Sequence, residues 1–129
     1  VLGGIPSSLP ALVKANRIQD KVRGVGFDWE EKEQIWDKVI EELKELKEEI
    51  NNGSQNEIEA EFGDLLFSII NAARLYGINP ENALERTNRK FTKRFNYLED
   101  RTLRIGKSLR DMSLNEMNLY WEEAKSYDD

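Results

Sequence analysis

The chain has 129 residues, of which 34% are charged and 9% aromatic, and its formal net charge is −6. This length predicts one domain with a real core, and the composition favours a helical globular domain over a disordered chain. The acidic balance gives no general attraction to nucleic acid or to anionic membranes, so neither is an expected partner.

The residue types that are missing narrow the chemistry further. The chain has no Cys and no His, which excludes disulfides, thiolate nucleophiles, cysteine zinc sites, Ser-His-Asp triads and di-iron bundles with histidine ligands. Metal chemistry is left to oxygen ligands, which suit Mg²⁺, Mn²⁺ or Ca²⁺. No apolar run reaches the ~20 residues that span a bilayer, and no signal-peptide pattern opens the chain. We therefore expect a cytoplasmic location, and the first residue, Val1, predicts a trimmed chain or a domain of something longer.

Residues 1–10 are an irregular lead-in rich in Gly, Pro and Ser, and residues 11–129 are expected to form one helical domain. From Ala11 to about Val25 the apolar residues recur at helical spacing, which predicts a first helix. The segment Asp28-Trp29-Glu30-Glu31 is typical of a capping box, so a second helix is predicted to open there and to run to about Asn51. The apolar stripe of this helix consists of Ile35, Trp36, Val39, Ile40, Leu43, Leu46 and Ile50. To one side of the stripe lie Lys38, Glu42, Glu45 and Glu49.

Three further helices follow, and each starts at a recognisable capping pattern. Ser54 to Glu57 opens the third, which extends to Tyr76, and Asn79-Pro80-Glu81 opens the fourth, which frays near Ile105. Ser113 to Glu116 begins a short last helix. Because no segment has the alternating pattern of a strand, we predict an all-α bundle of four to five helices.

Two acidic clusters lie on either side of the turn at residues 51–54, which would fold the second and third helices into an antiparallel hairpin. Glu42 and Glu45 are three residues apart, as are Glu61 and Asp64, so each pair projects from one side of its helix. Four converging carboxylates are unfavourable unless a hard cation lies among them. The first cluster alone fits a solvated helix surface better, but the two clusters on one hairpin favour a metal site.

Glu61 is the more informative of these acids, because helical spacing places it on the apolar face of its own helix. An unpaired carboxylate buried there would cost several kcal/mol. Residues 62–76 are almost all apolar, which predicts a central helix packed on most sides. Gly63 costs a further ~1 kcal/mol relative to Ala inside a helix, and the close approach of a neighbouring backbone would explain it. Two such exceptions within four residues indicate a functional site.

A basic segment follows on the fourth helix, where Lys90 and Arg94 are one turn apart and face the same way. They fit a phosphate clamp and a basic helix surface equally well. Trp121 and Lys125 repeat this spacing on the last helix. A tryptophan in such a position is more often a core or interface residue than a platform for a base, and the sequence leaves both readings open.

This ordered set of motifs resembles the MazG-type nucleoside triphosphate pyrophosphohydrolases over essentially the whole chain. It combines an EExxE cluster, an ExxD motif and an NxKFxxR segment, and the lead-in near residues 9–12 and 25–29 is similar to the start of that family's C-terminal catalytic domain. The matching residues are Glu41, Glu42, Glu45, Glu61, Asp64, Asn88, Lys90, Phe91 and Arg94.

The resemblance implies an all-α enzyme that is usually dimeric, depends on Mg²⁺ (with Mn²⁺ as a possible substitute) and cleaves nucleoside triphosphates between the α and β phosphates. The metal ligands that it implies are Glu42, Glu45, Glu61 and Asp64, and the implied nucleotide contacts are Lys38, Asn88, Lys90, Arg94, Trp121 and Lys125. A carboxylate that the metal does not fully occupy would accept a proton from the attacking water, and Glu41 and Glu45 are the candidates.

Three alternatives stay open at this point. The first is a relative restricted to one nucleotide such as dCTP or dUTP, and the second is a phosphoribosyl-ATP pyrophosphohydrolase. The third, from another class, is a non-catalytic helical dimerisation module with a solvated acidic face. The apolar stripe of the second helix, the apolar third helix and three Trp residues exceed what one small bundle buries, so a homodimer is expected.

Overall fold

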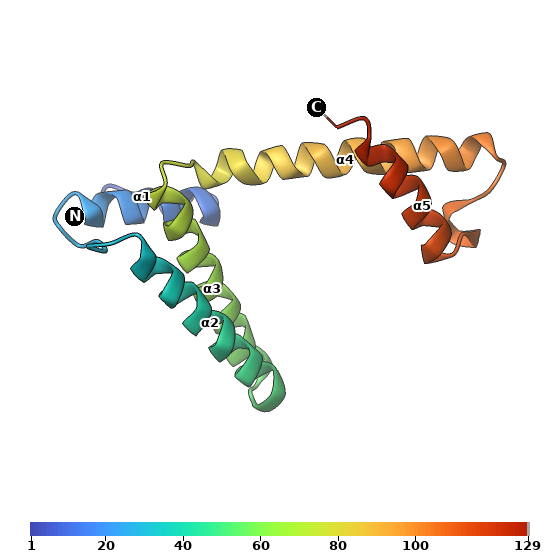
Figure 1. The fold of residues 1–129 in the computed structure, drawn as a ribbon. Helices are drawn as coiled ribbons and strands as arrows, with labels where there is room; N and C mark the ends of the chain where they lie inside the picture. Colours follow the sequence, from blue (N-terminus) through green and yellow to red (C-terminus); the bar gives the residue numbers. More distant parts are fainter. Residues whose placement is uncertain (129) are drawn as a thin grey trace. The chain divides into compact units, whose positions relative to one another are not determined.

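The computed structural model describes residues 1–128 and consists of helices joined by turns and loops (Figure 1). The α-helices are α1 (Ala11–Arg23), α2 (Glu33–Asn52), α3 (Gln55–Leu75), α4 (Pro80–Arg104) and α5 (Leu114–Lys125), and a short 3₁₀ helix, η1, spans Leu109–Asp111. No strand occurs among the described residues. The prediction of an all-α fold with four to five helices is therefore confirmed.

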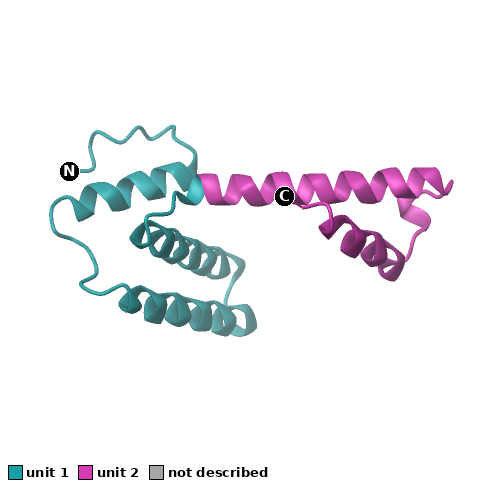
Figure 2. Cartoon of the chain, turned by 45° about the horizontal axis from the view of Figure 1, so that its top comes forward, with its two compact units in different colours: residues 1–81 teal, residues 82–129 magenta. Residues whose placement is uncertain are grey.

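The chain divides into two compact units, Val1–Glu81 and Asn82–Asp129 (Figure 2). The first unit contains α1, α2 and α3, and the second contains nearly all of α4 together with η1 and α5. The expectation of one helical domain over residues 11–129 stays a prediction. Within the described part of the chain, no helix is both long enough and apolar enough to cross a membrane.

In the first unit, α2 and α3 lie side by side as an antiparallel hairpin, and α1 packs against α3 (Figure 1). The chain reverses at Gly53, and Ser54 then caps α3 because its Oγ accepts a hydrogen bond from the Glu57 N–H at 3.3 Å. This satisfies one of the free N–H groups of the first turn. The hairpin and its capping residue were both predicted, and both are present.

The second helix starts later than predicted. α2 begins at Glu33, and Asp28, which was expected to cap it, forms ion pairs with Arg74 of α3 and Arg23 of α1 at 3.0 and 3.3 Å. The capping interpretation of residues 28–31 was wrong, because Asp28 accepts its local hydrogen bond from the adjacent Trp29 N–H, at 2.8 Å, and also binds the two distant arginines, while α2 starts five residues later. Asp28 therefore ties the loop before α2 to the other two helices of this unit.

The apolar residues of α2 divide between two faces rather than forming one stripe. Ile35 and Leu46 are buried, whereas Trp36, Ile40 and Leu43 remain exposed, Ile40 to 65%. The inner face also includes an acid that sequence spacing had placed beside the stripe, as the site below shows. A second apolar face on α2 is thus left uncovered in the single chain.

α3 also has an exposed apolar face, formed by Phe62, Leu66 and Ile69, which recur every three to four residues. A methyl group placed at Gly63 would meet nothing within 4 Å, so no backbone approaches closely there. The expectation of a central helix packed on most sides, with a neighbouring backbone at Gly63, is wrong within this chain. The helix packs on its inner side only, because α1 and α2 cover that side alone.

In the second unit, α5 contacts α4 through aromatic side chains and contacts the segment after α4 through an ion pair. The ring centroids of Phe91 and Trp121 are 5.0 Å apart, and Lys107 Nζ lies 3.0 Å from Glu116 Oε2. α5 begins at its predicted cap, since Ser113 Oγ accepts a hydrogen bond from the Glu116 N–H at 3.1 Å. Glu116 therefore both completes the cap and anchors the start of α5.

Candidate metal and nucleotide site

Three carboxylates of the hairpin meet at one place in the first unit. One oxygen from each of Glu42, Glu45 and Glu61 lies within 4.8 Å of the other two. α2 supplies the first two from neighbouring positions on one face, and α3, running the other way, supplies the third. The structure thus brings together three of the four predicted metal ligands, and we call them the carboxylate cluster.

Two acids of the carboxylate cluster, Glu45 and Glu61, have raised pKa values. Repulsion from Glu42 is the main cause that raises the pKa of Glu45, with burial adding to it. Burial raises the pKa of Glu61, and the negative charges of Glu45, Asp64 and Glu42 raise it further. A cation bound beside Glu45 and Glu61 would offset this repulsion.

Two oxygens of the carboxylate cluster are buried without a hydrogen-bond partner among residues 1–128. They are Oε2 of Glu42 and Oε2 of Glu61, and Glu42 as a residue is only 5% exposed. A buried acceptor without a partner costs about 1–3 kcal/mol, and a divalent cation would satisfy both atoms. An all-oxygen donor set suits Mg²⁺ or Mn²⁺, so the residues fit the metal that the sequence predicts.

Lys38 and Glu41 lie at the edge of the carboxylate cluster. Lys38 Nζ is 2.8 Å from Glu42 Oε1 and 3.8 Å from Glu41 Oε2. The hydrogen bond to Glu42 is the main cause that raises the pKa of Lys38, so the lysine keeps its charge. Of the two predicted proton acceptors, Glu45 lies inside the cluster, whereas the Glu41 side chain is 57% exposed at its edge.

A cavity of about 630 Å³ lies in the first unit beside the carboxylate cluster. Lys38, Glu42 and Asp64 belong to its lining, so the fourth predicted metal ligand shares this cavity with the cluster. The volume falls within the ~300–1,000 Å³ that is usual for small-molecule sites. Beyond the acids, α1, α3 and the loop before α2 provide the walls, which include Gln19, Phe27, Trp29, Phe67, Asn71 and Arg74.

In the second unit, two predicted nucleotide contacts lie together. Arg94 binds the carboxylate of Asp128 with its forked guanidinium group, Nε lying 3.1 Å from Oδ2. The same guanidinium carbon is 5.6 Å from the ring centroid of Trp121. The hydrogen bond between Arg94 and Asp128 raises the pKa of Arg94 and lowers that of Asp128. The cation is therefore ordered by an aromatic ring and by an acid near the end of the chain.

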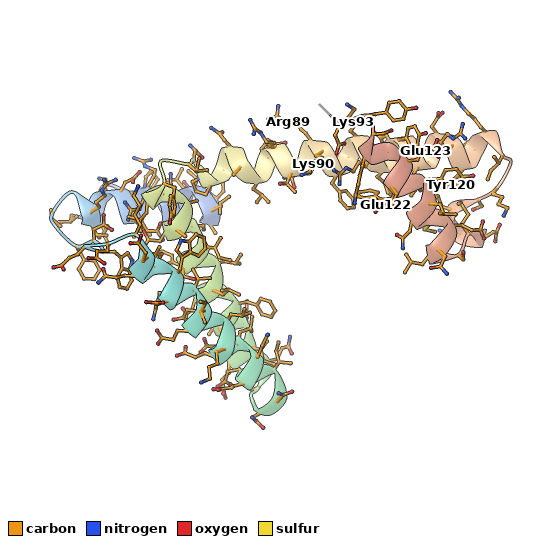
Figure 3. All side chains as sticks on the ribbon, viewed as in Figure 1. Arg89, Lys90, Lys93, Tyr120, Glu122 and Glu123 are labelled. Carbon is orange, nitrogen blue, oxygen red and sulfur yellow. The ribbon has the colours of Figure 1, made fainter. Side chains whose placement is uncertain are left out.

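The remaining predicted contacts are spread over the second unit. Lys90 is exposed on α4 (Figure 3). Lys125 of α5 has its Nζ 2.9 Å from Glu122 Oε1. Asn88 lines a groove with Arg89 on another side of α4, because two helical positions correspond to a rotation of about 200° and so separate it from Lys90. The structure does not bring Asn88 together with the basic pair.

The cavity wall away from the carboxylate cluster was missed by the sequence analysis. Arg74 interrupts an almost apolar segment of α3, which is a signal of a buried partner, and that partner is Asp28. Gln19 lies on the buried face of α1, where its Nε2 donates a hydrogen bond to the Phe67 carbonyl at 2.9 Å. The position of Gln19 within an apolar helical stripe could have indicated a buried polar group. Its partner, the Phe67 carbonyl, could not be known without the fold.

Comparison with known proteins places this arrangement in a family. The family model described as the MazG nucleotide pyrophosphohydrolase domain matches residues 30–98, just over half of the chain. A Thermotoga maritima protein named nucleoside triphosphate pyrophosphohydrolase/pyrophosphatase MazG is 43% identical over 128 residues, which are 99% of this chain and 49% of that protein. An Escherichia coli K12 protein named nucleoside triphosphate pyrophosphohydrolase is 39% identical over 126 residues, which are 96% of this chain and 48% of that protein.

The chain thus spans about half the length of these two relatives. The matched segment contains every member of the carboxylate cluster together with Lys38, Asp64, Lys90 and Arg94. The resemblance seen in the sequence motifs is confirmed. On its helical fold and on this match, the chain belongs to the MazG family of nucleotide pyrophosphohydrolase domains.

Proposed function

We propose that the chain is the catalytic part of a nucleoside triphosphate pyrophosphohydrolase, which cleaves a ribo- or deoxyribonucleoside triphosphate between the α and β phosphates. The products would be the monophosphate and pyrophosphate. One observation carries the proposal: three carboxylates converge within 4.8 Å, beside a cavity of about 630 Å³, and two of them keep a buried oxygen without a partner among the described residues. The names of the two relatives support the reaction class.

Glu42, Glu45 and Glu61 would hold Mg²⁺ or Mn²⁺, and Asp64, which lines the same cavity, would join them. When bound, the ion supplies positive charge that offsets the charge developing on phosphate oxygens. Lys38, held at 2.8 Å from Glu42, adds a fixed positive charge to the same side of the cavity. These groups bind and orient the triphosphate at the acidic side of the cavity.

Glu45 would accept the proton of the attacking water. Its pKa is raised by the charge of Glu42, and a carboxylate with a raised pKa is a better base near neutral pH. Glu41, the other candidate, is more exposed and lies 3.8 Å from the Lys38 ammonium. The environment therefore favours Glu45 for this role.

Further nucleotide contacts are proposed for Asn88, Lys90, Arg94 and Trp121, with a smaller part for Lys125. Arg94 and Trp121 are already arranged side by side, and a forked guanidinium is the side chain best suited to phosphate oxygens. The family match supports the two basic residues, since it extends to residue 98.

A homodimer is part of the proposal. The exposed faces of α2 and α3 carry Trp36, Ile40, Phe62, Leu66 and Ile69 at helical spacing, and a second copy of the hairpin would cover them. On α3 this face lies opposite the cavity lining, since the two sets of positions differ by about half a helical turn. The dimer would form without closing the cavity. We also retain the expectation of a cytoplasmic enzyme without a nucleic-acid partner.

Product analysis tests the reaction. The chain is incubated with each of the eight common nucleoside triphosphates, with and without Mg²⁺, and the products are separated by ion exchange. Monophosphate and pyrophosphate that form only with the metal support the proposal, whereas a diphosphate with orthophosphate shows cleavage at another bond. The same assay is run with dUTP and phosphoribosyl-ATP. A single accepted triphosphate such as dCTP or dUTP would favour the narrow-specificity alternative, and turnover of phosphoribosyl-ATP alone would favour a phosphoribosyl-ATP pyrophosphohydrolase. No turnover of any nucleotide would favour a dimerisation module.

A further inference from the structure

Two polar atoms in the cavity wall have no partner and are not used by the proposed chemistry. Outside the carboxylate cluster, the buried side-chain atoms without a hydrogen bond in residues 1–128 include Oε1 of Gln19 and Nη1 of Arg74. Both residues line the 630 Å³ cavity. Buried polar atoms in folded proteins nearly always have a partner, so a ligand of this cavity is expected to provide one.

The free atom of Gln19 is an acceptor, and the structure fixes which atom it is. The residue is 3% exposed, and its amide nitrogen donates to the Phe67 carbonyl at 2.9 Å. A carbonyl can only accept, so the nitrogen must face Phe67 and Oε1 must point the other way. The hydrogen bond to α3 therefore holds a lone acceptor in the cavity wall.

The free atom of Arg74 is a donor whose charge is already balanced. Its side chain is 6% exposed, and its Nη2 lies 2.6 Å from Asn71 Oδ1 and 3.0 Å from Asp28 Oδ1. Nε also donates to Asn71, which leaves Nη1 for a ligand. Because Asp28 neutralises the guanidinium, the remaining N–H group suits a neutral acceptor better than a phosphate.

The position of these atoms along the cavity separates them from the acids. The lining residues of α3 run from Asp64 to Arg74, ten positions or about 15 Å along the helix. A triphosphate held at the carboxylate cluster would leave its nucleoside to extend along this length. Phe27 and Trp29 in the same lining offer flat aromatic surfaces, on which bases stack favourably.

We propose that Gln19 Oε1 and Arg74 Nη1 hydrogen-bond the edge of the nucleobase and so determine which bases the chain accepts. On its Watson–Crick edge each base has a hydrogen-bond donor beside an acceptor, which is the complement of one acceptor and one donor in the wall. A base whose donor and acceptor are out of register would leave both buried atoms unsatisfied. This inference rests on the proposed function, since it places the nucleoside of the same substrate.

Metal-free binding tests this without turnover. The dissociation constants of AMP, GMP, CMP, UMP and ribose 5-phosphate are measured by calorimetry, without divalent ions, for the wild type, Gln19→Met and Arg74→Lys. Both substitutions keep the side-chain size or charge. We expect the tightest monophosphate to lose about tenfold in affinity, because an unsatisfied buried group costs about that much, while ribose 5-phosphate changes less than twofold. Ile70→Val, a buried α3 position that is absent from the cavity lining, is the control and should change no ratio between bases.

Analogues that lack one base group repeat the test by changing the ligand, on the wild type and on Gln19→Met. If AMP is the preferred monophosphate, purine riboside monophosphate should bind the wild type about tenfold more weakly, and the same deletion should cost Gln19→Met less than threefold. Equal losses for all four bases and for ribose 5-phosphate would overturn the inference and indicate a phosphate or structural role. Turnover that gives pyrophosphate with unchanged base preference in both variants would sink this inference alone. Base-selective binding without turnover would sink only the proposed reaction.

Discussion

Lys38 Nζ lies 2.8 Å from Glu42 Oε1, while the other oxygen of the same carboxylate is buried without a partner among the described residues. The lysine thus neutralises one side of a nearly inaccessible acid and leaves the other side available. This arrangement pairs Glu42 with a positive charge while it leaves one carboxylate oxygen for a metal ion to bind.

The first prediction concerns this pair. Lys38→Met should lower the free energy of unfolding of the metal-free protein by about 1 kcal/mol, because Glu42 loses its hydrogen-bond partner. This is the low end of the usual cost, since the Lys38 side chain is 38% exposed and solvent screens the pair. Saturating Mg²⁺ should recover most of the loss, since it would supply the missing positive charge. Urea unfolding with and without Mg²⁺ measures both effects. An apo stability equal to that of the wild type would show that the ion pair does not support Glu42.

The second prediction concerns Asp28, which joins Arg74 at 3.0 Å and Arg23 at 3.3 Å. Although burial opposes it, hydrogen bonds from the Trp29 N–H and from Arg74 lower the pKa of Asp28 below its usual value of 3.8. Asp28→Asn should cost about 2–3 kcal/mol of stability at pH 7, the value of hydrogen bonds to a charged group.

The pH dependence of that loss follows from the direction of the shift. Because the folded state holds the proton of Asp28 less tightly than the unfolded state, its contribution is fully present above pH 3.8 and fades as the pH falls through the lowered pKa. Thermal unfolding of both proteins between pH 3 and 7 gives the difference. A gap that persists unchanged into the acid range would show that Asp28 acts by packing rather than by charge.

The third prediction concerns the exposed hairpin face. The wild type should sediment as a dimer at micromolar concentration, and Leu66→Glu should shift it to a monomer near 15.0 kDa, because a carboxylate would be buried in the contact. Leu119→Glu on α5 is the matched control, since Leu119 is 72% and Leu66 58% exposed. A dimer that survives Leu66→Glu, or that only Leu119→Glu disrupts, would contradict a hairpin interface.

The fourth prediction concerns Arg94 and Asp128. If Arg94 binds phosphate, the Asp128 carboxylate competes for the same guanidinium group, so Asp128→Asn should lower KM for the triphosphate about three- to tenfold with little change in kcat. The charge-matched control is Glu116→Gln, whose partner is Lys107, a lysine without a proposed nucleotide contact. Steady-state kinetics of the three proteins gives both parameters. A raised KM in Asp128→Asn would mean that Asp128 orients Arg94 for the nucleotide instead of blocking it.

The helices and their caps could be predicted from the sequence because their causes are local. Ser54 and Ser113 cap helices with residues three positions later, and the acids of α2 and α3 met because a tight turn joins the two helices. Asp28 was misassigned for the opposite reason, since its preferred partner, Arg74, is 46 residues away. The sequence also could not show which apolar residues of α2 are buried, because the two faces have similar residues and only one of them packs against α3. The roles of the predicted site residues in binding and catalysis stay predictions.

The central claim is that the carboxylate cluster is a metal centre, and Glu61 tests it most directly. Burial and the neighbouring acids raise the pKa of Glu61, so Glu61→Gln removes a disfavoured charge while it preserves shape. Melting curves of the wild type and Glu61→Gln are recorded with and without Mg²⁺. We predict that the apo variant melts at the same or a higher temperature than the apo wild type, that Mg²⁺ raises the melting temperature of the wild type only, and that hydrolysis falls by at least about 100-fold. A destabilised variant whose melting temperature still rises with Mg²⁺ would contradict the metal-centre account.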